Sequence, residues 1–126
     1  MNQSEKVLLN SRLINQVKEA NNFDFIRFFL AYSVMFNHFS TLTETERKKG
    51  LITASAGNHA QGVAYAAKCY GCKAVIVMPT TTPLIKVNRT KSYGAEVVLC
   101  GDVYDEACQK AYELAEEKGY TFIHRS

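Results

Sequence analysis

The sequence predicts an α/β fold: a three-layer βαβ arrangement with a four-stranded parallel sheet, preceded by N-terminal helices. From residue 51 onward, short apolar runs alternate with helical patterns, which is typical of βαβ units. After Lys73, the run KAVIVMP (73–79) is continuously apolar, as expected of a strand that is covered on both faces of a parallel sheet. Connections between such strands are expected to be right-handed crossovers.

The elements follow one another along the chain, and turn residues mark their ends. Pro83 falls in the first turn of a helix, and Gly94 ends that helix. Asp102 is the expected N-cap of the last helix, which Gly119 ends. The predicted elements are strands at 51–56, 73–79, 95–101 and 120–124 and helices at 58–70, 83–93 and 104–118.

Composition limits the classes of protein that need to be considered. The 126 residues suit one small domain, and 47% of them are apolar, which is ample for a core. A net charge of +3 is too weak to indicate a nucleic-acid partner. No signal-peptide cleavage pattern is present, so the four cysteines are expected to be reduced thiols of a cytoplasmic protein.

The cysteines predict neither a redox site nor a metal site. Cys69 and Cys72 form a C-x-x-C, but Cys69 falls near the C-terminus of a predicted helix, where the dipole does not favour a thiolate. A structural zinc site needs four ligands, and no second pair has the right spacing. Cys100 and Cys108 are expected at core or half-buried positions.

The most informative stretch is LITASAGNHAQG (51–62), where a strand turns sharply into a helix. Asn58 occupies a natural N-cap position, and the small residues Ser55, Ala56 and Gly57 let a ligand approach the backbone. Such a helix N-terminus favours an anion, and ligands bind at the carboxyl ends of parallel strands. The stretch is a candidate cradle for a carboxylate or phosphate, with an ordinary βα turn as the alternative.

The string SAGNHAQGVAYAAK closely resembles the Asn-His loop of the threonine dehydratases (threonine ammonia-lyases), pyridoxal-phosphate enzymes of fold type II. The resemblance begins near Leu42 and continues to about His124. It implies that Ser55, Ala56, Gly57, Asn58 and His59 hold the substrate carboxylate and that Asn58 also contacts the ring oxygen of the cofactor.

The resemblance also implies a function in amino-acid metabolism. These lyases remove water and then ammonia from threonine or serine to leave a 2-oxo acid, as in isoleucine biosynthesis. The expected cofactor is pyridoxal phosphate, and the expected partner is a small amino acid. His59 is expected to support neighbouring groups rather than act as a base, because the family assigns proton abstraction to a lysine. Gln61 and Gly62 are expected to serve helix packing, and 80–82 to form a polar loop.

Two parts of the family's cofactor site are missing. An S-x-K-x-R segment, whose lysine forms the Schiff base, should lie roughly twenty residues before the first strand. No lysine occurs between Lys18 and Lys48. The glycine-rich loop that grips the cofactor phosphate would lie past the last residue of this sequence. The expectation is a partial small domain that is catalytically incomplete alone, with its catalytic residues unknown.

The N-terminal part resembles a different family. NNFDFIRFFLAYSVMFNHF (21–39) is similar to the first membrane helix of integral-membrane O-acyltransferases, with His38 eleven residues after Arg27. The resemblance implies that this histidine is a base for acyl transfer. The apolar stretch is shorter than the ~20 residues that span a bilayer, so a soluble or interfacial helix is the alternative.

The expected organisation is therefore an acyltransferase-like helical segment at 1–41 and a partial pyridoxal-phosphate-enzyme domain at 42–126. Residues 5–20 predict an amphipathic helix that seeks a partner. Residues 21–39 are expected to dock as one helix on the sheet or, failing that, to stay exposed. An exposed helix would favour membrane contact or self-association. The first hypothesis is thus a fragment of a dehydratase, the second is a non-catalytic interaction protein, and the third is a remnant of a membrane acyltransferase. The expected location is the cytoplasm, and a membrane location is the alternative.

Overall fold

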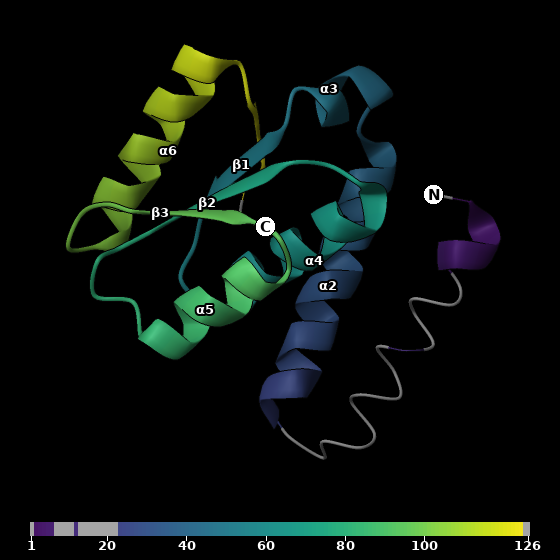
Figure 1. Ribbon diagram of the computed structural model, residues 1–126, viewed down its shortest axis with the longest axis horizontal. Helices are drawn as coiled ribbons and strands as arrows, with labels where there is room; N and C mark the ends of the chain where they lie inside the picture. Colours follow the sequence, from purple (N-terminus) through teal and green to yellow (C-terminus); the bar gives the residue numbers. More distant parts are fainter. Residues whose placement is uncertain (1, 7–11, 13–22, 125–126) are drawn as a thin grey trace.

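The sheet at the centre of the molecule is four-stranded and entirely parallel, with strand order β3-β2-β1-β4 (Figure 1). The computed structural model describes residues 2–6, 12 and 23–124. The strands are β1 (Leu51–Ala54), β2 (Ala74–Met78), β3 (Glu96–Leu99) and β4 (Thr121–Phe122). The predicted α/β fold with four parallel strands is confirmed, although each strand is shorter than its apolar run.

Helices cover both faces of this sheet. They are α2 (Phe23–Thr41), α3 (Glu44–Lys48), α4 (Asn58–Tyr70), α5 (Leu84–Ser92) and α6 (Tyr104–Lys118). Figure 1 shows α6 on one side of the sheet and α2, α4 and α5 on the other. The fold therefore has the three layers that the sequence predicts. The amphipathic helix predicted for 5–20 falls almost entirely outside the described residues.

Alternation along the strands divides the core in two. On β1, Leu51 faces the α4 layer and Ile52 faces the α6 layer. On β2, Ile76 joins the first cluster, and Val75 and Val77 join the second. All five side chains are at most 2% exposed. Successive side chains of a strand point to opposite faces, so a strand covered on both sides must be apolar throughout.

The helix ends agree only in part with the turn residues. Gly119 ends α6 in the left-handed conformation, with φ of +75°. Pro83 is the residue before α5 rather than a member of its first turn. The prediction that Asp102 caps α6 is wrong, because Val103 is the N-cap residue and no side chain makes a capping hydrogen bond there. Instead the Glu106 carboxylate accepts a hydrogen bond from the Asp102 backbone N–H (3.3 Å).

The sequence predicts docking on the sheet, but helix α2 docks chiefly on α4, through the buried face of its described part. Tyr32, Met35 and Phe39 are at most 4% exposed. The Tyr32 ring meets the Tyr65 ring edge-on at 5.1 Å. In the part of the chain that the structure describes, no helix is long and apolar enough to cross a membrane.

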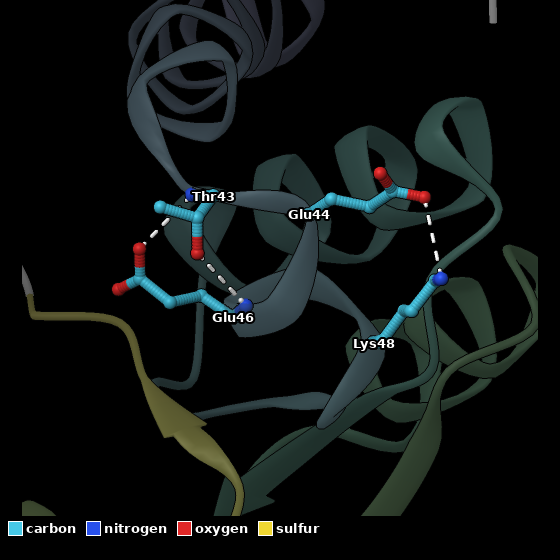
Figure 2. A network of polar contacts seen from close by, with 4 residues as sticks. All are labelled: Thr43, Glu44, Glu46 and Lys48. Atoms are coloured by element: carbon cyan, nitrogen blue, oxygen red, sulfur yellow. Dashed lines mark hydrogen bonds and ion pairs between the residues drawn. The ribbon is translucent and has the colours of Figure 1, made fainter.

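A capping box fixes the short helix α3 (Figure 2). The Thr43 hydroxyl accepts from the Glu46 backbone N–H (3.1 Å), and the Glu46 carboxylate accepts from the Thr43 backbone N–H (2.9 Å). This second bond lowers the pKa of Glu46. The Glu44–Lys48 ion pair in the same view (3.3 Å) is exposed and contributes little.

Helix α3 also ties its neighbours together. The Arg47 guanidinium donates to the carbonyls of Phe39 (2.9 Å) and Leu42 (2.6 Å), at the end of α2. The Thr121 hydroxyl on β4 donates to the Glu46 carbonyl (2.8 Å). The turn between α2 and β1 is therefore anchored to both α2 and the edge strand of the sheet.

Candidate functional site

The loop at 55–59 lies at the carboxyl end of β1 and leads directly into α4. The Ser55 backbone N–H donates to the Val77 carbonyl (3.0 Å), which extends the pairing of β1 with β2 by one residue. Ser55 is 3% exposed, whereas 56–59 are half-buried. The loop therefore has a fixed base in the sheet and a partly accessible upper side.

The N-cap of α4 is Gly57, so the prediction that Asn58 caps this helix is wrong. The Gly57 carbonyl accepts from the Gln61 backbone N–H (3.3 Å), which places Asn58 already inside the helix. No side chain makes a capping hydrogen bond at Gly57, and no acidic residue lies in the first turn of α4. The positive end of the helix dipole therefore meets no carboxylate of its own first turn.

Open space adjoins the loop at Gly57. A Cβ atom built there would meet no other atom within 4 Å. Its φ of −141° does not require glycine, so the backbone conformation does not explain the residue. The packing does not require glycine either, because the space beside Gly57 is open.

The other residues that the sequence singled out near the loop have packing roles. Gln61 is 2% exposed, and Gly62 is buried in α4. Thr80 donates from both its backbone N–H (2.8 Å) and its hydroxyl (3.0 Å) to the Gly101 carbonyl. The Thr81 hydroxyl donates to the Asp102 carbonyl (3.3 Å). These threonines bind the loop after β3 to the loop after β2, as expected of a polar βα connection.

This chain lacks the lysine that the resemblance predicts as the covalent anchor of pyridoxal phosphate. The region about twenty residues before β1 lies in α2, whose residues Phe23–Thr41 include no lysine. Helix α2 runs in the same direction as α4, because Tyr32 packs on Tyr65 and Phe36 packs on Tyr70. Its N-terminal half therefore extends toward the carboxyl edge of the sheet, but it carries no amine there.

The thiols have the environment of packing residues. All four cysteines of the described region are free. Cys69 is buried in α4, and burial raises the pKa of its thiol and that of Cys72. A raised pKa leaves little thiolate at neutral pH. Within the described ranges, His, Cys, Asp and Glu side chains form no group of three that could hold a metal ion.

Comparison with known proteins places the chain among cofactor-dependent enzymes. The family described as pyridoxal-phosphate dependent enzyme matches residues 30–126. L-threonine ammonia-lyase of Thermotoga maritima is 48% identical over 89 residues, 71% of this chain and 22% of that protein. The biosynthetic L-threonine dehydratase of Escherichia coli is 50% identical over 93 residues, 74% of this chain and 17% of that protein.

Solved structures of similar enzymes match the same part of this chain. The processed form of threonine deaminase isoform 2 from Solanum lycopersicum has a TM-score of 0.71 and 49% identity, over 75% of this chain and 27% of that one. Maize serine racemase has a TM-score of 0.68 and 34% identity, over 71% of this chain and 27% of that one. The chain thus spans 17–22% of the length of the two curated relatives described above.

Proposed function

The chain belongs to the family of pyridoxal-phosphate-dependent enzymes, and from this premise we propose that it carries the substrate-carboxylate loop of a threonine or serine dehydratase without the lysine that such an enzyme needs. The observation that supports the proposal is the 55–59 loop at the carboxyl edge of the sheet. Its glycine leaves open space beside a helix N-terminus that no side chain caps. By itself the chain is then a lyase domain that binds but does not catalyse.

Each loop residue has a proposed part in binding. The backbone N–H groups of Gly57, Asn58 and His59 donate to the carboxylate of a small amino acid, assisted by Ser55 and Ala56. The Asn58 side chain contacts the ring oxygen of pyridoxal phosphate. When bound, that cofactor supplies the electron sink for amino-acid chemistry. The free cysteines are compatible with the proposed cytoplasmic location.

We expect this chain to form no family-type Schiff base with pyridoxal phosphate. The reason is the absence of a lysine from α2. The purified protein is mixed with the cofactor, reduced with borohydride and mapped by mass spectrometry, and 2-oxo acid formation from threonine is measured in parallel. Scattered, substoichiometric labelling of surface lysines and no 2-oxo acid are expected. One stoichiometric adduct together with turnover of threonine would refute the proposed incompleteness.

We expect the loop to bind threonine or phosphate weakly, with dissociation constants in the millimolar range, about 4 kcal/mol. Amide NMR shifts of Gly57, Asn58 and His59 report the binding. Gly57→Ala should abolish these shifts, because its methyl group fills the space above the loop. The melting temperature should fall only slightly, because alanine is a poorer N-cap than glycine but its methyl group meets no neighbour.

A matched control is Gly119→Ala, which lies far from the loop at the end of α6. Its φ of +75° makes alanine strained, although nothing lies within 4 Å. This variant should lose stability and keep the threonine shifts, the reverse of Gly57→Ala. If both variants bind threonine equally well, the loop does not hold the carboxylate.

The second candidate function is a non-catalytic interaction through α2. Leu30 and Val34 lie one turn apart on this helix and are 59% and 49% exposed. Neighbouring apolar side chains on an exposed helix face favour contact with a membrane surface or with a second copy of the chain. Sedimentation of the chain with and without lipid vesicles tests this candidate.

A further inference from the structure

A cavity of about 230 Å³ lies at the opposite edge of the sheet from the 55–59 loop. It is a groove between α6 and the strands β2 and β3. Its position at the amino ends of the strands follows from two lining residues, Lys73 just before β2 and Tyr120 just before β4. We call it the lysine groove, and its lining residues are Lys73, Val75, Glu96, Val98, Lys110, Leu114, Lys118 and Tyr120.

The spacing of these residues explains why they share one surface. Positions 110, 114 and 118 are four apart and fall on one face of α6. Along a strand, every second side chain lies on the same face of the sheet. Residues 73 and 75 therefore share a face with 96 and 98 on the neighbouring strand. The groove therefore has an apolar floor of valine and leucine side chains and a rim of charged side chains.

The packing of α6 explains why the groove stays open. The small residues Ala107 and Ala111 let α6 approach β1 and β2 closely, where both alanines are fully buried. The edge strand β3 lies beyond that contact. On this face Val98 is therefore only half-buried and Glu96 is exposed.

The charges around the groove do not cancel. Three lysines face one glutamate, a net charge of +2. Lys73 lies 3.8 Å from the Glu96 carboxylate. Over the described ranges the other ion pair is Glu44–Lys48, so Lys110 and Lys118 have no acidic partner there.

Tyr120 gives the groove a fixed end. A Cβ at Gly50 would lie 3.0 Å from the Tyr120 ring, so the ring rests on the bare backbone of that glycine. The Lys73 ammonium lies 5.4 Å from the centre of the same ring. The tyrosine hydroxyl and then Glu96 raise the pKa of Lys73.

We propose that the lysine groove binds a small organic phosphate monoester, with the phosphate among the three lysines and the organic group on the apolar floor. A phosphate dianion matches the net charge of the rim, and lysine is a common point-charge ligand of phosphate. The apolar floor selects an organic ester over inorganic phosphate, because burying its hydrocarbon adds to affinity. This site is separate from the carboxylate loop and does not depend on the proposed lyase ancestry.

The test is an NMR titration of the full chain with phenyl phosphate and, separately, with inorganic phosphate at low salt. Phenyl phosphate should shift the amides of 96–98 and 110–118 and bind more tightly than inorganic phosphate. Lys110→Gln should weaken binding about 1.4- to five-fold, the range that an exposed charge pair gives. Glu96→Gln should tighten binding, because it removes the one negative charge from the rim.

Two controls make the result specific. Lys86→Gln changes an exposed lysine on α5, outside the groove, and should leave the affinity unchanged. The groove shifts should persist in Gly57→Ala, which blocks the other proposed anion site. Equal effects of Lys110→Gln and Lys86→Gln, or phenyl phosphate shifts confined to 57–59, would overturn the proposal. Melting curves of each variant establish that it is folded.

Discussion

Phe39→Ala is expected to destabilise the protein by about 3–5 kcal/mol, the usual result of removing a buried aromatic ring. Phe39 is 0% exposed and joins α2 to the core cluster that contains Leu51. Its ring lies 5.8 Å from that of Tyr70, at the far end of α4. Because a small domain has a total stability of only about 5–15 kcal/mol, urea unfolding should show a large shift of the midpoint.

Val34→Ala is the control on the same helix. Val34 is 49% exposed, and alanine is the better helix former, so the free energy of unfolding should change by less than about 0.5 kcal/mol. A second measurement removes residues 1–40 altogether. The loss of Tyr32, Met35 and Phe39 should abolish cooperative unfolding. A truncated chain that is more soluble and equally stable would show that α2 is an appendage rather than part of the core.

The sequence predicts the sheet well because a buried parallel strand leaves a continuous apolar run. The run at 73–79 contains β2, which lies at an interior position of the sheet. Helix starts are less predictable from single residues. Asn58 and Asp102 are favourable caps by type, yet Gly57 and Val103 take those places. In the second case a side chain from inside the helix, Glu106, reaches back to the backbone.

The sequence predicts that the α2 segment docks, but it does not identify which face of the helix is buried. The segment is apolar over most of its length, so its pattern selects no single face for burial. Only the structure distinguishes Phe39, which is buried, from Val34, which is exposed.

The two candidate binding sites differ in how far the sequence alone identifies them. The residues of the 55–59 loop are contiguous, so their string of letters is informative. The lysine groove joins Lys73 to Lys110 and Lys118, which are scattered along the sequence and meet only through the topology.

The connection after β3 contains a glycine that is constrained both by its backbone angle and by its neighbours. Gly101 has φ of +84°, and a Cβ atom there would overlap the Glu106 Cβ and lie 3.3 Å from the Ala107 backbone nitrogen. The backbone cannot easily move away, because the Gly101 carbonyl accepts two hydrogen bonds from Thr80. An alanine at this position must therefore strain the backbone, displace the start of α6 or break those bonds.

We expect Gly101→Ala to cost about 1–3 kcal/mol for the left-handed backbone and about 1–3 kcal/mol more for the steric overlap. Gly94→Ala separates the two contributions, because Gly94 has a similar φ of +89° and nothing within 4 Å of the added atom. Urea unfolding of both variants measures the difference, which belongs to the overlap with α6. Equal losses in the two variants would mean that α6 can shift at no cost. The Thr80 bonds would then not fix the position of the loop after β3.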